Sequence, residues 1–395
     1  QHEAAGDLLI PDPETGEKIN VSHMIPKSRE DVARRHKGLR RIAEHTIGVM
    51  GRTPDYMNVT YAGFAGCFDE WAEHGNEAGA ERLVAYQKWL RRNDISLTHT
   101  LIHPTIDKMR DEIPGQENEV ILHKVGETAR GIVVRGARIL ATLAPFSDEI
   151  AVYPGRPLPP NSDKFAVSFC IPMTTPGLKF MCRDSVAGTE NRFDHPLSSR
   201  FDEQDAFAIY DDVEVPWDRV FIDGNTKVYN QVMTRSWNSN VMQQTMVRAS
   251  TKLEFAWALA TLMTEAINDK SPNAQAMLGE LWSYAELARS AVENAEDHSR
   301  EWTNGCWYPA AEPLSALRAT MPFWMPRANE IIRLLGSHNL LATPTWHMMN
   351  NADLRPYIDK YLRGANETTA ERRVRLCRLA WDYAGTALAS RVELY

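Results

Sequence analysis

Residues 51–58 of the chain have the sequence Gly-Arg-Thr-Pro-Asp-Tyr-Met-Asn, which predicts the start of a helix. Thr53 suits the N-cap because its hydroxyl can accept a backbone N–H, and Pro54 suits the first helical position because an N–H there has no partner. Arg52 places a cation at the end of the helix dipole that favours anions. Tyr56 follows one turn later, so a guanidinium and a phenol are expected at one helix mouth. The alternative is a surface arginine beside a core tyrosine.

The chain before and after this helix has apolar residues at helical spacing up to about residue 94. Ser28 is the expected N-cap of a preceding helix, in a sequence similar to a capping box. A further helix is predicted for residues 77–92, where the apolar positions recur every three to four residues. Residues 1–94 are therefore expected to form an N-terminal helical domain.

From residue 95 the apolar period changes to two, which is typical of half-buried strands. Residues 132–134 and 139–141 are expected to form a hairpin that turns at Gly136. Further short strands with Gly and Pro between them follow, and no helical pattern is interleaved. Residues 95–222 are therefore expected to form a central antiparallel β-barrel or sheet domain.

The helical period returns at residue 223 and continues to the end of the chain. Long helices are predicted for residues 236–267, 273–301, 315–335 and 355–389. Long helices with few breakers are typical of an antiparallel bundle, so residues 223–395 are expected to form a C-terminal helix-bundle domain. The fold class is α+β.

Composition limits the possible partners. The chain has 395 residues and a formal net charge of −8, which argues against binding nucleic acid through its phosphates. It has no apolar run long enough to span a bilayer, so no membrane partner is expected. Its five cysteines are widely spread and contain no Cys-x-x-Cys pair, so neither a disulfide framework nor a metal site is expected. These features favour a cytoplasmic location.

Four segments resemble the 4-hydroxyphenylacetate 3-monooxygenase family, the flavin-dependent phenol and halophenol hydroxylases. Residues 51–56 match its Gly-Arg-Thr-Pro-Asp-Tyr segment, and residues 98–104 are similar to its Asn-His-Ala-x-x-Asn-Pro. Residues 196–203, with Val-Pro-Trp at 215–217, resemble its Pro-Leu-Ser-Ser-Arg-Phe-Asp-Glu run. Residues 361–366 are a fourth match. The segments occur in the family's order and span nearly the whole chain.

The resemblance implies an acyl-CoA dehydrogenase-like fold and a homotetramer. It also implies the oxygenase component of a two-component monooxygenase, which uses reduced FAD (FADH2) and O2 to hydroxylate a phenolic substrate through a C4a-hydroperoxyflavin. The sequence contains neither Gly-x-Gly-x-x-Gly nor a P-loop motif. A separate flavin reductase is therefore expected as the partner that supplies the reduced flavin.

The resemblance also implies the catalytic residues. A phenolate is more nucleophilic than a phenol, so the site needs a proton acceptor near the hydroxyl or a cation that stabilises the conjugate base. His99 is the candidate for handling the hydroxyl because imidazole titrates near working pH. Arg52 would stabilise the phenolate or peroxide anion, and Tyr56 would hydrogen-bond the substrate or close the pocket. The alternative for His99 is a hydrogen-bonded structural histidine.

The family places flavin contacts in the segment that follows this histidine and on a strand threonine. The matching residues here are Leu101, Ile102, His103, Thr105, Ile106, Asp107, Lys108 and Thr142. Two positions depart from the family, because Thr98 and His103 stand where it has asparagine. The local hydrogen bonds to the flavin are therefore expected to differ.

Other flavoproteins of the same fold are alternatives. A 4-hydroxybutyryl-CoA dehydratase needs three cysteines and a histidine for its iron–sulfur cluster, and Cys67, His298 and Cys306 supply only part of such a set. An acyl-CoA dehydrogenase needs a carboxylate in the bundle, for which Glu367 is the candidate. A non-catalytic flavin-binding scaffold is the third alternative, and it would be supported if Arg52 or His99 lay far from any cavity.

Overall fold

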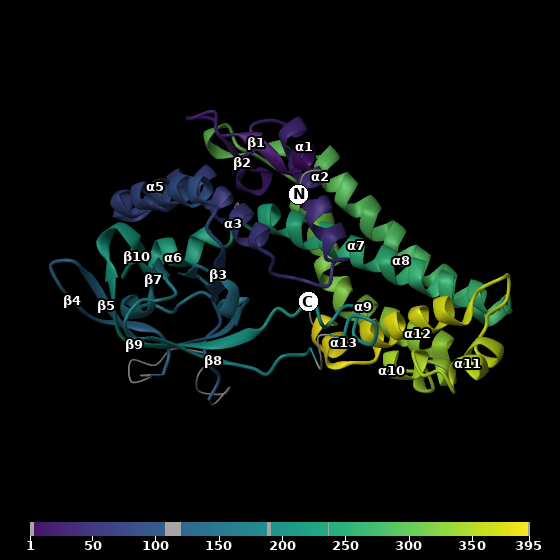
Figure 1. Cartoon of the computed structure of the whole chain (residues 1–395). Helices are drawn as coiled ribbons and strands as arrows, with labels where there is room; N and C mark the ends of the chain where they lie inside the picture. Colours follow the sequence, from purple (N-terminus) through teal and green to yellow (C-terminus); the bar gives the residue numbers. More distant parts are fainter. Residues whose placement is uncertain (1–3, 107–119, 188–190, 236, 394–395) are drawn as a thin grey trace.

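The computed structural model describes residues 4–106, 120–187, 191–235 and 237–393 (Figure 1). Helices form one end of the molecule and two β-sheets form the other, and the chain passes from helices to strands and back to helices. This order is that of the acyl-CoA dehydrogenase-like α+β architecture, so the expected fold class is confirmed. Among the described helices, none has the length and apolar character needed to cross a bilayer.

The N-terminal part is helical, with a small β-hairpin at its start. Its elements are α1 (Ala5–Leu8), β1 (Leu9–Pro11), β2 (Lys18–Asn20), η1 (Val21–His23), α2 (Arg29–His45), α3 (Pro54–Gly66), α4 (Phe68–Ala72), η2 (Glu73–Gly75) and α5 (Glu77–Asn93). The cap predicted for α2 is present, because Ser28 Oγ accepts the backbone N–H of Asp31 at 3.2 Å. The Asp31 carboxylate in turn accepts the N–H of Lys27 at 2.9 Å. This reciprocal pair satisfies two backbone donors at the helix start.

Two four-stranded sheets follow. The first has the order β10-β7-β6-β3 and the second β4-β5-β9-β8. Their strands are β3 (Leu97–Thr100), β4 (His123–Glu127), β5 (Gly131–Thr142), β6 (Glu149–Val152), β7 (Val167–Pro172), β8 (Leu178–Cys182), β9 (Asp205–Pro216) and β10 (Val220–Asp223), with 3-10 turns η3 (Ala144–Phe146), η4 (Asp163–Phe165) and η5 (Trp217–Arg219). Buried residues of both sheets form one hydrophobic cluster, and α5 packs against β10 of the first sheet.

Two strand predictions differ from the structure. The pairing is antiparallel except for β3, which runs parallel to β6 with His99 opposite Ala151. The predicted hairpin is wrong, because residues 131–142 form the single strand β5. Gly136 has φ +116° and lies where the register of β5 against β9 shifts, so it belongs to a bulge rather than to a turn.

The C-terminal part is a bundle of long helices. Its elements are α6 (Thr226–Val232), α7 (Trp237–Ala266), α8 (Pro272–Asp297), β11 (Arg300–Glu301), η6 (Thr303–Gly305), β12 (Trp307–Tyr308), α9 (Ala311–Leu341), α10 (Trp346–Met349), α11 (Arg355–Tyr361), α12 (Ala370–Ala384) and α13 (Ala387–Val392). The single helix predicted for residues 355–389 is wrong. It is divided into α11, α12 and α13 because Asn366 and Glu367 have positive φ and Thr369 caps a new helix.

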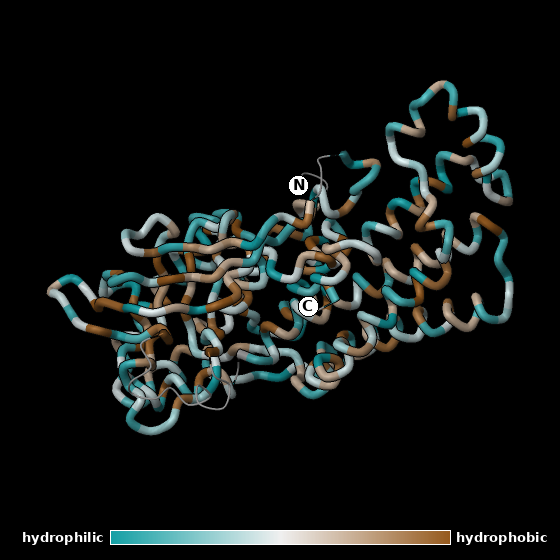
Figure 2. The backbone as a smooth tube through the Cα atoms, turned by 90° about the horizontal axis from the view of Figure 1, so that it is seen from below, coloured by the Kyte–Doolittle hydropathy of each residue, from teal (hydrophilic) through white to brown (hydrophobic). Residues whose placement is uncertain are grey.

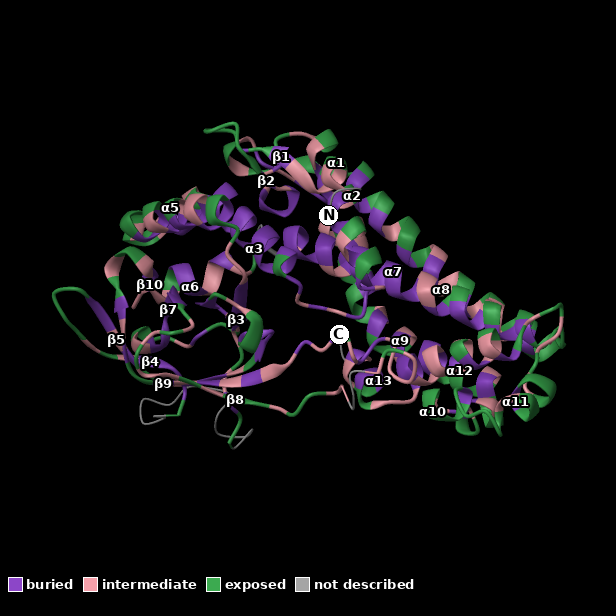
Figure 3. Cartoon of the chain, in the orientation of Figure 1, coloured by how far each residue is buried: buried purple, intermediate pink, exposed green. Residues whose placement is uncertain are grey.

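The core of the helical parts is continuous with that of the first sheet. A large cluster of buried side chains extends from α3 and α5 through β3 and β6 into α7, α9 and α12. Apolar and polar residues alternate along the chain (Figure 2), and α3 and much of α7 are buried whereas α10 and α11 are largely exposed (Figure 3). The short helix α13 returns the chain to the middle of the molecule, between the bundle and the sheets (Figure 1).

Candidate active site

The site is built around the start of α3. Thr53 is the N-cap and Pro54 the first helical residue, as predicted, but the Thr53 hydroxyl makes no capping hydrogen bond. A carboxylate of the protein lies at this helix mouth, because Glu203 accepts the backbone N–H of Arg52 at 2.5 Å. The Arg52 guanidinium donates to the carbonyl of Gly51 at 3.1 Å. The segment that leads into β9 therefore fixes the start of α3.

Four side chains from three segments are stacked beside this helix mouth. The Arg52 guanidinium carbon lies 4.2 Å from the centre of the Tyr56 ring. The Tyr56 and His99 rings are stacked with centroids 5.1 Å apart and planes inclined by 26°. His99 also stacks on Tyr153, with centroids 5.5 Å apart and planes inclined by 21°. Because β3 and β6 run side by side, the strand residue His99 and Tyr153, just after β6, reach the same place. Arg52 and Tyr56 thus meet at one helix mouth as expected, and His99 lies beside them; the catalytic roles of the three residues stay a prediction.

Burial sets the protonation of the stack. Desolvation, together with the nearby charge of Arg52, lowers the pKa of His99 to about 3. The expectation that His99 titrates near working pH is therefore wrong for the free protein, in which the ring is neutral. Its Nδ1 is buried and has no hydrogen-bond partner within the described residues, so it is not the satisfied structural histidine of the alternative. Burial also raises the pKa of Tyr153 well above its ordinary value, so this phenol stays protonated.

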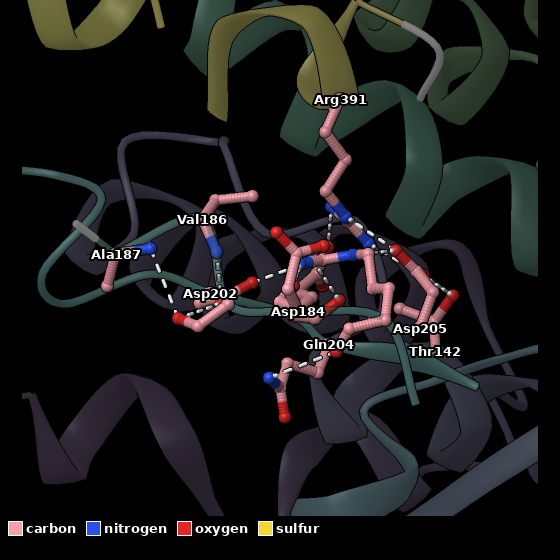
Figure 4. Close-up of polar contacts among 11 residues, drawn as sticks. Thr142, Asp184, Val186, Ala187, Asp202, Gln204, Asp205 and Arg391 are labelled. Atoms are coloured by element: carbon pink, nitrogen blue, oxygen red, sulfur yellow. Dashed lines mark hydrogen bonds and ion pairs between the residues drawn. The ribbon is translucent and has the colours of Figure 1, made fainter. Parts of the chain in front are cut away.

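A buried arginine joins the helix mouth to the end of β5 (Figure 4). Arg391 on α13 donates to Glu203 at 2.8 Å and, through Nε and Nη2, to Asp205 at 2.9 and 3.0 Å. Asp205 also accepts the hydroxyl of Thr142 at 2.7 Å and Nε of Arg183 at 3.1 Å. Burial opposes ionisation of Asp205, but the contacts with Arg391, Thr142 and Arg183 together outweigh it, and the pKa of Asp205 is lowered. One guanidinium thus fixes both the carboxylate that binds Arg52 and the carboxylate that binds Thr142.

These supporting residues were not predicted from the sequence as part of the site. Tyr153 lies in the part expected to form short strands, and Glu203 ends the segment 196–203, to which no catalytic role was assigned. Arg391 lies far along the chain in a segment predicted to be bundle helix. Of these residues, only Tyr153 could have been found from the sequence. It lies at the end of a predicted strand, and if that strand pairs with the strand of His99, the two aromatic rings reach the same edge of the sheet.

The residues expected to contact flavin lie along β5 and the segment that follows β3. The Leu101 carbonyl accepts a hydrogen bond from Nη1 of Arg138 at 2.8 Å, and the Ile102 carbonyl accepts the N–H of Ile139 at 2.9 Å. Thr142, at the end of β5, is held to β3 because its carbonyl accepts the hydroxyl of Thr98 at 2.6 Å. Thr105 and Ile106 are exposed, and Asp107 and Lys108 lie outside the described residues.

The buried polar atoms of this region fit a flat cofactor with a polar edge. Both ring nitrogens of His103 are buried and lack partners in the part of the chain that the structure describes. The same holds for Nε and Nη2 of Arg138. Burial and the charges of Arg138 and Arg156 lower the pKa of His103 to about 3, so its ring is neutral. Ile102 beside them is 41% exposed, which supplies an apolar surface. An isoalloxazine ring has the apolar faces and hydrogen-bonding edge that such a set would hold.

Arg52 also borders a cavity of about 290 Å³ between α7 and α9. Its other polar lining residues are Thr245, Arg248, Arg318 and Glu393. Tyr56 and His99 are not among the lining residues, so Arg52 separates this cavity from the aromatic stack.

The donor set of an iron–sulfur cluster is not assembled. Cys67 and Cys306 meet in a buried cluster, where Cys67 Sγ lies 3.2 Å from the Tyr308 hydroxyl. His298 is exposed and its Nδ1 contacts the carbonyl of Asn294 at 3.0 Å. The described residues contain no group of three or more His, Cys, Asp or Glu side chains able to hold a metal ion. The residues do not fit the dehydratase alternative.

Comparison with known proteins agrees with this geometry. Family models described as 4-hydroxyphenylacetate 3-hydroxylase N terminal and C terminal match residues 1–222 and 228–395. The oxygenase component of 4-hydroxyphenylacetate 3-monooxygenase from Thermus thermophilus is 35% identical, over 100% of this chain and 81% of its own. The oxygenase component of 4-nitrophenol 2-monooxygenase from a Rhodococcus species is 30% identical, over 100% of this chain and 76% of its own.

Solved structures give the same result. The crystal structure of the 4-hydroxyphenylacetate 3-monooxygenase oxygenase component complexed with FAD and 4-hydroxyphenylacetate superimposes with a TM-score of 0.94 at 34% identity, covering 100% of this chain and 81% of that one. An archaeal 4-hydroxybutyryl-CoA dehydratase superimposes with a TM-score of 0.88 but only 17% identity, which shows a shared fold alone. Fold and site thus define a flavin-dependent aromatic monooxygenase. More particularly, the chain belongs to the 4-hydroxyphenylacetate 3-hydroxylase family.

Proposed function

We propose that the chain is the oxygenase component of a two-component monooxygenase that hydroxylates a phenolic substrate with O2 and reduced FAD from a separate flavin reductase. The observation that carries the proposal is the stack of Arg52, Tyr56 and His99, in which an arginine and a neutral imidazole both contact one phenol ring. The relatives named as oxygenase components support the need for a reductase partner.

Arg52 and His99 are proposed to act on the substrate hydroxyl. The neutral imidazole of His99 accepts the hydrogen bond of the phenol, and the Arg52 guanidinium stabilises the negative charge that grows on the oxygen as the proton leaves. The negative charge on the phenol oxygen also favours protonation of His99, because a nearby anion raises the pKa of a base. The ring carbon next to the hydroxyl becomes more nucleophilic as a result. Tyr56 positions the substrate by hydrogen bonding and by closing the pocket.

Flavin is proposed to lie along β5 and the segment after β3. Leu101, Ile102, His103, Thr105, Ile106 and Thr142 would hold it, together with Asp107 and Lys108. When bound, reduced FAD supplies the two electrons and the oxygen-activating chemistry. The chain's own part is to hold the flavin, to exclude water and to aim the phenol. The unpartnered nitrogens of His103 support this assignment, because a bound ring edge would supply the partners that they lack.

The assembly and location of the protein are also part of the proposal. Five large apolar side chains of the bundle are at least half exposed: Trp282, Leu287, Phe323, Leu334 and Leu341. Exposed apolar surface of this kind favours association, and we propose a homotetramer, which native mass spectrometry would test. The five cysteines all lie among the described residues and form no disulfide with one another, which supports a cytoplasmic location. We also propose three domains at residues 1–94, 95–222 and 223–395.

The test is a single turnover. The protein is loaded anaerobically with reduced FAD and 4-nitrophenol or 4-hydroxyphenylacetate, mixed with oxygen, and the hydroxylated product per flavin is measured by chromatography. Wild type is expected to form product with at least one phenol. His99→Ala is expected to oxidise the flavin with release of hydrogen peroxide and little product, whereas the exposed control His298→Ala behaves as wild type. Absence of product from every phenol tested, or full product formation by His99→Ala, contradicts the proposal.

A further inference from the structure

A second cavity, of about 480 Å³, lies in the N-terminal part of the molecule. It is enclosed by the β1–β2 hairpin, η1, α2, α3 and α5, which lie together in Figure 1. No residue of the Arg52–Tyr56–His99–Tyr153 stack lines it. Its apolar walls are formed by Ile10, Ile19, Met24, Ile25, Ala65 and Val84. A mostly apolar concavity of this size is typical of a small-molecule site.

One of the residues that line this cavity, His23, is a buried polar group without a partner among the described residues. His23 is the last residue of η1 and is only 1% exposed. Neither Nδ1 nor Nε2 has a hydrogen-bond partner among the described residues. Its backbone is fixed, because the Asn20 side chain caps η1 and Gln87 donates to the His23 carbonyl at 3.3 Å. Buried polar groups in folded proteins are almost always hydrogen-bonded, so a rigidly held, unpartnered imidazole in the lining of a cavity indicates that a ligand supplies the missing partner.

The charged groups around the cavity are already engaged by the protein. Arg91 donates to Asp12 at 2.7 Å, and Lys88 pairs with Glu14 at 2.7 Å. Lys27 donates to the Asn304 carbonyl at 2.8 Å. Because these cations have protein acceptors, a charged ligand would have to displace an existing contact. The cavity therefore favours a neutral molecule.

His23 itself is neutral. Burial, with the nearby charge of Arg91, lowers the pKa of His23 to about 3. A neutral imidazole has one N–H donor and one nitrogen acceptor. A hydroxyl group can satisfy either nitrogen, because it donates and accepts hydrogen bonds, and an attached hydrocarbon or aromatic ring would fill the apolar walls.

We propose that this cavity is a second binding site, separate from the oxygenase site, for a small neutral molecule with one hydroxyl on an apolar body, of which a simple phenol is the representative. His23 binds the hydroxyl, and the side chains from the hairpin, α3 and α5 enclose the ring. The proposal does not rest on the catalytic assignment, since none of its residues belongs to the stack or to the expected flavin contacts.

The experiment locates a phenol directly. Crystals of the full chain are soaked with 4-bromophenol, and bromine positions are found from anomalous scattering. A bromine peak is expected in the cavity, with the phenol oxygen within hydrogen-bond distance of an imidazole nitrogen of His23. In His23→Phe, which keeps a ring but removes both nitrogens, occupancy in this cavity is expected to fall at least tenfold. Occupancy next to Arg52 and His99 is expected to stay the same.

A second variant keeps the proposal testable if His23→Phe does not fold. Ala65→Leu leaves His23 intact and fills the cavity from α3, and it is expected to exclude 4-bromophenol from this site alone. Equilibrium dialysis with radiolabelled phenol should show one fewer bound molecule per chain in either variant than in wild type. Ordered water alone on His23 in crystals whose oxygenase site is occupied, or unchanged cavity occupancy in both variants, would overturn the proposal.

Discussion

Replacing Arg391 by methionine tests whether the buried arginine, rather than the local sequence, fixes the helix mouth. Arg391 is 9% exposed in its side chain and contacts two carboxylates, Glu203 and Asp205. In the variant Asp205 keeps Arg183 and the hydroxyl of Thr142, whereas Glu203 keeps the backbone N–H of Arg52 but loses its guanidinium partner. A buried carboxylate is thus left without its ion-pair partner.

The expected magnitude follows from that loss. Removing one partner of a buried pair costs about 3–5 kcal/mol, and the partners that Asp205 retains favour the lower end. About 3 kcal/mol corresponds to a roughly 100-fold change in a local opening equilibrium. Hydrogen exchange measured by mass spectrometry should show this loss of protection at the start of β9, in α13 and at the first turn of α3.

The matched control is Arg375→Met on α12. Arg375 is 60% exposed and pairs with Glu371 one turn away, a contact worth about 0.3–0.5 kcal/mol. Its exchange should change less than threefold. Converting Glu203 to glutamine in the Arg391→Met background should recover part of the lost protection, because no unpaired charge then remains buried. A change of less than tenfold in Arg391→Met, or no recovery in the double variant, would refute the reasoning.

Three further outcomes are expected. The pKa of His99 is about 3 in the folded protein, against 6.5 for an exposed histidine, so its contribution to stability is complete above pH 6.5 and is lost as the pH falls. From pH 7 to 5 this one group accounts for about 2 kcal/mol. In denaturant titrations wild type should therefore lose about 2 kcal/mol more than His99→Phe, which keeps the similar contributions of His23 and His103. Gly48 has φ +72° and an added Cβ would lie 2.5 Å from the Arg248 carbonyl, whereas Gly16 has φ +74° in open space. Gly48→Ala should therefore lower the melting temperature clearly more than Gly16→Ala, and equal shifts would contradict the structure. Thr142→Val removes the hydrogen bond to Asp205 and should weaken reduced-FAD binding about threefold to tenfold in anaerobic fluorescence titrations; unchanged affinity would remove Thr142 from the flavin site.

Sequence rules predicted the secondary structure correctly where the conformation depends on residues that are close in the chain. The cap at Ser28, the helix start at Thr53-Pro54 and the change of period near residue 95 all appear in the structure, although the Thr53 hydroxyl makes no capping hydrogen bond. The hairpin at Gly136 failed because a glycine with positive φ serves a bulge as well as a turn. A bulge forms here rather than a turn because the long strand β9 pairs with β5 on both sides of Gly136. The prediction of one helix for residues 355–389 failed because apolar residues keep helical spacing across the break before α12, where Thr369 caps a new helix.

The site was predictable to the extent that family motifs carry it. Arg52 and Tyr56 were predicted to meet at one helix mouth, and they do, with His99 beside them. Their supports were not predictable, because the contacts of Arg391 with Glu203 and Asp205 join segments almost 190 positions apart in the chain. The protonation of His99 also could not be derived from sequence, since it depends on how completely the ring is buried.

The central claim is that Arg52 stabilises a phenolate held against His99, and the ionisation of a bound phenol tests it most directly. 4-Nitrophenol changes colour on ionisation, so its pKa in the site can be measured by absorbance during a pH titration of the complex. An arginine close to an ionising oxygen lowers its pKa by about 1–3 units. The pKa of bound 4-nitrophenol should accordingly be at least one unit lower in wild type than in Arg52→Gln. Equal values in the two proteins would contradict the account.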